Sequence, residues 1–299
     1  MALLAVYRRY DMFKIFTDNG SDIPEDYARE HNIETLNLAT IIDGVVYNQG
    51  VELKKDKFYE MLAAGSKPST SQINPEQAKQ FFEEHIADAD EFLFICISSG
   101  LSGTYQSLTV GAREIMEKYP GKRIEVVDTL TGSLGEMLTL YKAVKMRDAG
   151  VSFDEVVAFV KENAVHSCLA ITVDNLMDLW RGGRVSKTSA IIGTIAAIKP
   201  FITVENDGTL NAGGKIRGRK KSLDHIVDYM EEHMGSYRDM NEIIMIAHGN
   251  CPEDAEYLKN KIEERLGFKK FMVNQIGPMI GTHTGPTICL AGYFGETRS

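Results

Sequence analysis

The chain has few of the features that place a protein in a membrane or in an oxidising compartment. No stretch among its 299 residues approaches the ~18 to 20 apolar residues that a bilayer-spanning helix needs. It has four cysteines, which stand far apart, form no CxxC pair and do not cluster with histidine. Such cysteines are typical of reduced core residues, so we expect a cytoplasmic protein without stable membrane insertion.

Positive charge is also scarce. Lysine and arginine together number 33, against 42 aspartates and glutamates, which leaves a formal net charge of -9. A broad positive field draws proteins to nucleic acid and to anionic lipid surfaces. The composition therefore argues against both and favours a small-molecule or protein partner.

Signatures of several catalytic classes are missing. The sequence contains no GxSxG elbow, no GxxxxGK[ST] phosphate loop, no GxGxxG and no HExxH. Its hydroxyl groups are plentiful, but no pattern marks one of them as a nucleophile activated by a neighbouring base. We therefore expect no cofactor and no metal.

What the chain does contain is an alternation of short strand-like runs with longer helical patterns, which is the signature of an α/β protein. Several runs are continuously apolar, as expected of strands that are covered on both faces. The sequence predicts an α/β fold of two domains with largely parallel or mixed sheets. The predicted strands are 13–18, 92–97, 124–128, 168–173, 243–248 and 271–276, and the predicted helices are 75–86, 132–149, 152–164, 222–233 and 253–266.

Residues 1–11 are interpreted as an extension ahead of the first domain. They hold about five apolar residues, too few for a signal peptide, and their charges follow the apolar stretch instead of preceding it. We place one α/β domain over residues 12–160 and a second over 161–299.

Two hydroxyl-rich segments each precede a predicted helix. Ser69 to Gln72 lies before helix 75–86, whose start is marked by a possible Asn74 cap and by Pro75. The second segment, Ser98 to Thr104, follows the predicted strand 92–97. Such loops at the ends of parallel strands can bind an anion through free N–H groups, or they can simply cap helices and turn the chain.

Two further motifs carry polar groups between glycines. His283 lies in Gly277 to Pro286, after a predicted strand, where it could donate to a carboxylate or have a structural role. Trp180 to Ser186 holds Arg181 and Arg184, which could pair with a carboxylate or form structural salt bridges. Its glycines predict a turn that ends one helix, with Ser186 capping the next.

A basic run stands out in this acidic chain. It comprises Lys215, Arg217, Arg219, Lys220 and Lys221. We interpret it either as a solvated face or as a docking patch for an acidic partner. Nucleic acid is disfavoured because no aromatic residues interleave with the charges.

Taken together, these motifs resemble the DegV family, the bacterial fatty-acid-binding proteins that supply a fatty acid kinase. The resemblance runs from about Met12 to the C-terminus, and its specificity lies in the order and spacing of the motifs. These are T-D-x-x-x-D at Thr17, Asp18 and Asp22, T-S-Q at 70–72, S-S-x-L-S-G-T-Y at 98–105, V-D-T at 127–129, G-G-R-V-S at 182–186, I-K-P at 198–200, R-G at 217–218 and G-x-H-x-G-P at 281–286.

The resemblance implies that a long-chain fatty acid is held between two α/β domains. Its carboxylate would be bound by Thr70, by Ser98 or Ser99, and by His283. The protein would not be an enzyme, because in this family a separate ATP-dependent kinase makes the acyl phosphate. The family's basic surface would give the run around Arg217, Arg219 and Lys220 a role in docking that kinase.

Two other functions remain open at this point. One is a serine-dependent hydrolase or transferase acting on an acyl or phosphoryl group. It would use Ser98, Ser99 or Ser102 as nucleophile and His283 as the base. The other is a protein–protein interaction module whose cleft is incidental.

Overall fold

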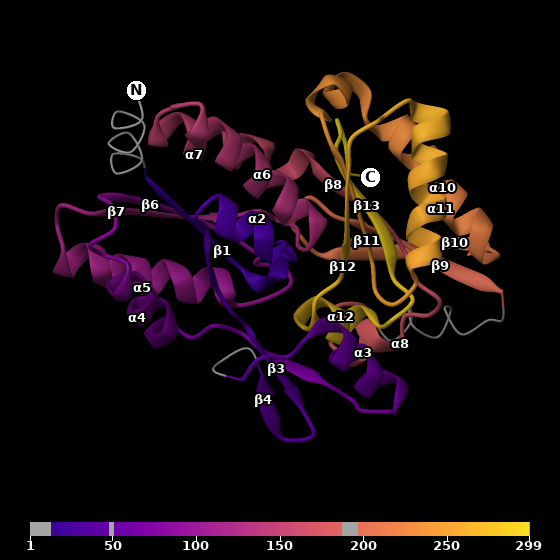
Figure 1. Cartoon of the computed structure of the whole chain (residues 1–299), viewed down its shortest axis with the longest axis horizontal. Helices are drawn as coiled ribbons and strands as arrows, with labels where there is room; N and C mark the ends of the chain where they lie inside the picture. The colour runs from indigo at the N-terminus through magenta and orange to yellow at the C-terminus, as the bar shows by residue number, and fades with distance from the viewer. Residues whose placement is uncertain (1–12, 48–50, 187–196, 299) are drawn as a thin grey trace.

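Three β-sheets and their flanking helices form the part of the chain that the computed structural model describes, residues 13–47, 51–186 and 197–298. Figure 1 shows two lobes side by side, with the smallest sheet below them. We call the four-stranded sheet, its helices and the smallest sheet the first lobe. The six-stranded sheet, its helices and α12 form the second lobe.

The four-stranded sheet is entirely parallel and has the order β2-β1-β6-β7. Its strands are β1 (Lys14–Asp18), β2 (Glu34–Leu36), β6 (Glu91–Cys96) and β7 (Arg123–Asp128). Residues 92–96 of β6 are all buried, which agrees with the continuously apolar sequence of that strand. This sheet is the parallel α/β arrangement that the sequence predicts.

The six-stranded sheet is mixed, with the order β10-β9-β8-β13-β11-β12. Its strands are β8 (Ser167–Thr172), β9 (Ile198–Val204), β10 (Leu210–Arg217), β11 (Ile244–His248), β12 (Phe271–Gln275) and β13 (Cys289–Phe294). Only the β11–β12 pair is parallel. This mixed sheet agrees with the prediction of largely parallel or mixed sheets, and a tight turn at Gly208 joins β9 directly to β10 and makes this pair antiparallel.

The smallest sheet contains β3 (Ala39–Ile42), β4 (Val45–Tyr47) and β5 (Ser69–Ser71), paired antiparallel in the order β4-β3-β5. The prediction of a loop over Ser69 to Gln72 is thus wrong for its first three residues. Short polar side chains do not mark β5 as a strand in the sequence, and it is the pairing with β3 that extends it. Thr70 lies opposite Thr40 and is held in a fixed register.

The helices separate the sheets into layers. Helices α4 and α5 cover one face of the four-stranded sheet, and α7 packs on β6 and β7 of that sheet. Helix α6 lies between the four-stranded and six-stranded sheets, and α10 and α11 cover the far face of the latter. Helix α6 is buried on nearly every side, so one apolar core runs through both lobes. The described helices are η1 (Asn19–Ser21), α2 (Glu25–Glu30), α3 (Lys55–Ala63), α4 (Pro75–Glu84), α5 (Thr104–Lys118), α6 (Leu134–Asp148), α7 (Phe153–Asn163), η2 (Ala164–His166), α8 (Met177–Arg181), α10 (Arg219–His233), η3 (Gly235–Met240), α11 (Pro252–Leu266) and α12 (Pro278–Thr284).

The six strands and five helices that were predicted by residue range are all present at their predicted places. The capping box at the start of α4 is confirmed, because Asn74 and Gln77 bond each other's backbone N–H groups. The domain boundary at residue 160 stays a prediction. It falls inside α7, and the first strand of the second sheet begins at Ser167.

The contact between α6 and β1 buries carboxyl groups. The Thr17 hydroxyl donates to Glu136 Oε1 over 2.9 Å, while Glu136 Oε2 is buried without a hydrogen-bond partner among the described residues. Asp18 accepts from the N–H groups of Gly20 and Ile97 at 2.7 and 3.0 Å. Burial raises the pKa of Asp18 to about 6 and the pKa of Glu136 well above its ordinary value.

Glu136→Gln is expected to leave the free energy of unfolding nearly unchanged at the ordinary glutamate pKa of 4.5 and to stabilise the protein increasingly above it. The folded wild type holds a proton that the unfolded chain releases, so its stability falls as the pH rises from 4.5 towards the raised pKa. One such group lowers the free energy of unfolding of the wild type by at most about 1.4 kcal/mol for each pH unit. Chemical unfolding between about pH 5 and about pH 8 measures this, with the exposed Glu117→Gln as control. Identical pH profiles for wild type and Glu136→Gln would contradict it.

Candidate ligand-binding site

A cavity of ≈380 Å³ lies between the lobes. Most of its wall is apolar, and strands β8, β9, β10 and β13 supply one side of it. This volume is within the range of small-molecule sites. The apolar lining residues are Leu38, Ile97, Leu101, Leu169, Ile171, Leu179, Val204, Leu210, Met279, Ile280, Ile288 and Leu290.

Polar groups from several separate segments also line this cavity. Thr70 comes from β5, Ser102 from the loop before α5, Arg184 from the turn after α8 and His283 from α12. The structure thus brings together two of the predicted carboxylate ligands, Thr70 and His283. Thr70 Oγ1 and His283 Nε2 are 2.9 Å apart and share a hydrogen bond across 213 residues of sequence.

His283 lies in the last turn of α12, a short helix that the sequence analysis does not predict. Pro278 occupies the start of this helix, and Gly285, with a φ of 73°, ends it. Burial, with a smaller contribution from the Arg184 charge, lowers the pKa of His283 to about 4. The imidazole is therefore neutral near pH 7, with one N–H to donate. Its Nδ1 has no hydrogen-bond partner within the described ranges.

Ser98 and Ser99 do not line the cavity. Ser98 is fully buried, donates from Oγ to the Gly208 carbonyl at 2.9 Å and accepts there from the Gly100 N–H at 3.0 Å. The Ser99 N–H donates to Asp128 Oδ1 at 3.1 Å. The structure therefore does not bring either serine to this cavity with Thr70 and His283, and their assignment as carboxylate ligands stays a prediction.

Ser102 occupies the position expected of Ser98 or Ser99. The N–H groups of Leu101 and Ser102 both donate to the Ser98 carbonyl, and this turn directs Ser102 towards the cavity. Its hydroxyl is 2.9 Å from that of Thr104. The sequence could have pointed to Ser102, because this residue stands immediately before Gly103 and the start of α5. The first N–H groups of a helix have no partner within the helix and are common places for ligand contacts.

Arg184 fastens the serine loop to the second lobe. Its Nε and Nη2 donate to the Leu101 carbonyl at 3.1 and 2.8 Å, and Nη1 donates to the Gly182 carbonyl.

Arg181, the other arginine of this motif, forms an ion pair with Asp178. The predicted turn is confirmed, since α8 ends at Arg181 and Gly183 has a φ of 76°. Ser186 is described, but the helix it was predicted to cap lies outside the described residues.

An outer cleft of ≈740 Å³ adjoins the cavity. Thr70, Arg184 and His283 line both spaces, so they form the boundary between the apolar cavity and this cleft. The cleft is otherwise lined by residues such as Ser66, Lys67 and Asn250. A carboxylate bound at this wall would have its acyl side in the cavity and its oxygens towards the cleft.

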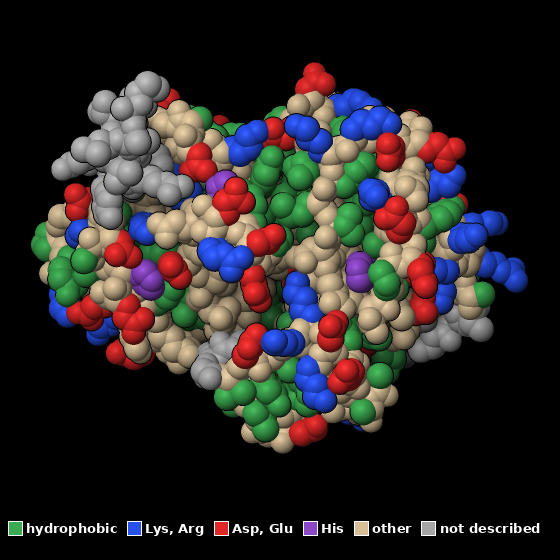
Figure 2. Space-filling model, viewed as in Figure 1, with side chains coloured by type: hydrophobic (Ala, Val, Ile, Leu, Met, Phe, Trp, Pro, Cys, Tyr) green, Lys and Arg blue, Asp and Glu red, His purple; other side chains and the backbone are tan. Residues whose placement is uncertain are grey.

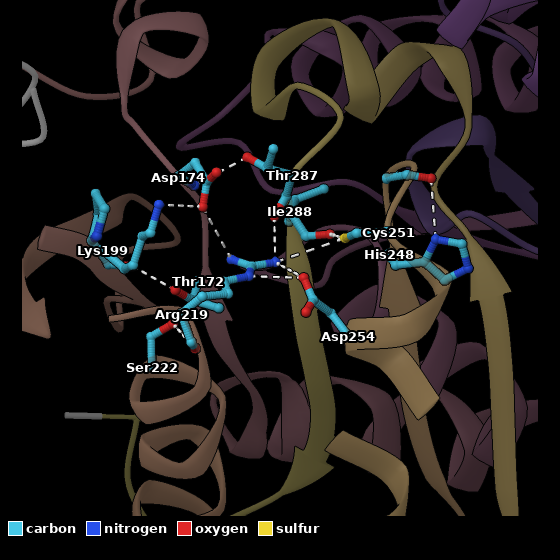
Figure 3. A network of polar contacts seen from close by, with 12 residues as sticks. Thr172, Asp174, Lys199, Arg219, Ser222, His248, Cys251, Asp254, Thr287 and Ile288 are labelled. Carbon is cyan, nitrogen blue, oxygen red and sulfur yellow. Dashed lines mark hydrogen bonds and ion pairs between the residues drawn. The ribbon is translucent and has the colours of Figure 1, made fainter. Parts of the chain in front are cut away.

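The predicted docking residues divide into two groups. Lys215, Arg217, Lys220 and Lys221 are exposed, and Figure 2 shows basic side chains projecting at the right-hand edge, where Figure 1 places β10. Arg219 points inward instead (Figure 3). It donates to Asp254 Oδ2 at 2.8 Å and to the Thr287 carbonyl at 2.7 Å, which ties α10 to α11 and to the segment before β13.

Two features are not found in the described ranges. No group of three or more His, Cys, Asp or Glu side chains among those residues is arranged to hold a metal ion. None of their helices combines the length and apolar character needed to cross a membrane.

The sequence model of the family described as "Uncharacterised protein, DegV family" matches residues 12–294. The chain belongs to the DegV family. A DegV domain-containing protein of Clostridium perfringens is 38% identical over 288 residues, which cover 96% of this chain and 98% of that protein. Another, from Caldanaerobacter subterraneus subsp. tengcongensis, is 36% identical over 284 residues, with coverage of 95% and 98%.

Solved DegV structures share the whole fold. A fatty-acid-binding DegV protein from Thermus thermophilus is 27% identical, with a TM-score of 0.83 and coverage of 95% of this chain and 99% of its own. A DegV protein from Ruminococcus gnavus, solved with vaccenic acid, is 25% identical, with a TM-score of 0.83 and coverage of 94% and 100%. The predicted family and the two-lobed α/β fold are confirmed.

Gly182→Ala is expected to displace His283 and lower the free energy of unfolding by about 1–3 kcal/mol, the usual cost of overpacking. A Cβ on residue 182 would collide with the His283 ring, which has no free space on its Nδ1 side. Thermal unfolding measures the loss, with Gly121→Ala as control because a Cβ there meets nothing within 4 Å. An unchanged stability of Gly182→Ala would show that the ring is free to move.

Proposed function

We propose that this DegV protein binds a long-chain fatty acid, with the acyl chain in the inner cavity and the carboxylate at Thr70, Ser102 and His283. The observation that carries the proposal is an apolar cavity between the lobes that ends at a polar wall. The Thermus and Ruminococcus relatives, which bind fatty acids on the same fold, support it.

The energetics of transfer fit such a ligand. Each buried methylene contributes about 0.8 kcal/mol, so ~15 methylenes give a gross term near 12 kcal/mol before ordering costs. An unpaired buried carboxylate would cost several kcal/mol, so its oxygens need donors. Two hydroxyls and a neutral imidazole N–H would supply those donors, and the Arg184 guanidinium at the same wall would add a positive charge.

The structure leads us to move the serine ligand from Ser98 or Ser99 to Ser102. The hydroxyl of Ser98 is already used by Gly208 and Gly100, while Ser102 lines the cavity. Arg184 then has a supporting role, because it holds Leu101, the residue next to Ser102.

We further propose that the protein does not catalyse a reaction itself but presents the carboxylate to an ATP-dependent fatty acid kinase in the cytoplasm. The outer cleft would give the kinase access to the carboxylate, and the exposed cations of β10 and α10 would dock it. Free thiols at the four cysteines support a reducing compartment. His283 bonds the Thr70 hydroxyl, not a serine, which disfavours the hydrolase alternative.

Native mass spectrometry of protein freshly purified from cells tests this function, together with turnover assays on ester and phosphoester substrates. We expect a co-purifying fatty acid mass and no turnover. An empty protein that hydrolyses either substrate would overturn the proposal.

Ser102→Ala is expected to weaken long-chain fatty acid binding, whereas Ser99→Ala on the same loop keeps wild-type affinity. Loss of one hydrogen bond to the charged group should cost about 1.5–3 kcal/mol, and His283→Ala should cost a similar amount. Thr70→Val with Ser102→Ala should be non-additive because both hydroxyls would share one carboxylate. Titration calorimetry measures these variants and the single Thr70→Val, five in all. A loss at Ser99 but none at Ser102 would place the carboxylate elsewhere.

Arg217→Glu combined with Lys220→Glu should slow association with the kinase and lower acyl phosphate formation, with fatty acid affinity unchanged. Charges at the rim of an interface mainly steer association, so the defect should shrink as salt rises. The control is Arg113→Glu combined with Lys118→Glu on α5, which makes the same change of charge at two exposed positions of the first lobe. Equal defects in both double variants would assign the effect to net charge and remove the docking face.

A further inference from the structure

The T-D-x-x-x-D motif at the start of the chain has no role in the site described above. Thr17 and Asp18 act inside the first lobe, on Glu136 and on the loops that follow β1 and β6. Asp22 differs because it is buried, with 5% exposure, and its hydrogen bonds reach residues from both lobes.

One side of Asp22 holds the start of α12. Its Oδ1 accepts from the Gly277 N–H at 2.7 Å, and its backbone carbonyl accepts from Asn274 Nδ2 at 2.6 Å. Gly277 is the residue immediately before α12, and His283 lies in the last turn of this short helix. Asp22 is therefore attached to the same rigid element as the imidazole.

The other side of Asp22 holds a residue of the cavity wall. Its Oδ2 accepts from the Ser133 hydroxyl at 2.6 Å, and Ser133 lines the cavity. Ser133 has a φ of 49° and a ψ of -127°, a conformation that non-glycine residues rarely adopt. Its N–H donates to the Gly20 carbonyl at 2.6 Å, so Ser133 is held in this conformation by the segment that carries Asp22.

Two side chains from α3 hold the neighbouring part of the second lobe. Lys55 Nζ donates to the Gln275 carbonyl at 2.6 Å, and the Tyr59 hydroxyl donates to the Ile276 carbonyl at 3.1 Å. Residues 274–277 are thus clamped by the first lobe. Asp22, Lys55 and Tyr59 are the residues that hold this segment. Of these three described residues, only Asp22 binds both the start of α12 and the cavity wall.

We infer that Asp22 is a positioning residue, which fixes α12 against the first lobe so that His283 meets Thr70 and the ligand carboxylate. The inference rests on the proposed function, because it concerns the same carboxylate. Helix α12 also packs on β3, on the Thr70 strand β5 and on η1, which ends beside Asp22. Loss of the Asp22 contacts therefore alters the distance between the carboxylate ligands, while the apolar wall on β8, β9 and β13 stays in place.

The test compares Asp22→Ala with Asn32→Ala. Both residues lie in the first lobe, and their φ angles are 51° and 53°. Asn32 is exposed, whereas Asp22 is buried. Asn32→Ala therefore controls for the loss of a short polar side chain in this backbone conformation. Affinities are measured for a long-chain fatty acid and for the fatty alcohol of the same chain length. The ratio of the two affinities reports on carboxylate recognition, whereas a general loosening of the lobes weakens both ligands alike.

We expect Asp22→Ala to lower the acid-to-alcohol affinity ratio about threefold to thirtyfold, and Asn32→Ala to leave it unchanged. Asp22→Asn should restore most of the ratio, because an amide keeps an acceptor for the Gly277 N–H and can donate to Ser133 Oγ. In a His283→Ala background, Asp22→Ala should have no further effect on the ratio.

An unchanged ratio in Asp22→Ala, or an equal loss in the His283→Ala background, overturns the inference. If Asp22→Ala does not fold, Asn274→Ala removes the contact to the Asp22 carbonyl together with a contact from Lys55 Nζ. It should lower the ratio in the same direction, while Lys55→Ala, which keeps the bond to Asp22, should lower it less; an unchanged ratio in Asn274→Ala also overturns the inference. A wild type that does not prefer the acid to the alcohol overturns the proposed function itself, whereas a selective wild type with an equally selective Asp22→Ala overturns this inference alone.

Discussion

The hydrogen bond between Thr70 and His283 depends on almost every other part of this structure. It joins β5 to α12 over 2.9 Å and forms, together with Arg184, the boundary between the apolar cavity and the adjoining cleft. Burial keeps the imidazole neutral, so the positive charge at this boundary is that of the Arg184 guanidinium, which donates to the Leu101 and Gly182 carbonyls. Recognition of an anion then depends on geometry, because each donor must reach a ligand that cannot be solvated from the cavity side.

That geometry comes from the way the two lobes are joined. Helix α6 lies between the sheets and gives them one continuous core, and Gly292 of β13 allows close contact, since a Cβ there would lie 2.8 Å from that of Leu134. The six-stranded sheet supplies the wall for an acyl chain, while the first lobe supplies Thr70 and Ser102. On the face in Figure 2, hydrophobic side chains gather in the hollow between the lobes. Arg184 and Asp22 then fix polar segments across this junction.

The sequence alone predicts the parts of the protein that local pattern controls. Strands such as β6 and β11 are covered on both faces and are therefore continuously apolar, and α4 carries its own capping box. Strand β5 could not be predicted, because only pairing with β3 makes Ser69–Ser71 extended. Ser98 and Ser102 are equally plausible ligands until the turn at Leu101 shows which one faces the cavity. Arg219 belongs to a basic run in the sequence but bonds Asp254 from a helix 35 residues away.

The most direct test of the account is a crystal structure of the complex with a long-chain fatty acid that carries bromine on its terminal carbon. Anomalous scattering locates the bromine independently of the protein density. We predict the bromine against the strands of the six-stranded sheet, near Leu169 and Leu290, and the carboxylate within hydrogen-bond distance of Thr70 and Ser102. Bromine at the Thr70–His283 wall, or a ligand bound outside this cavity, would contradict the account.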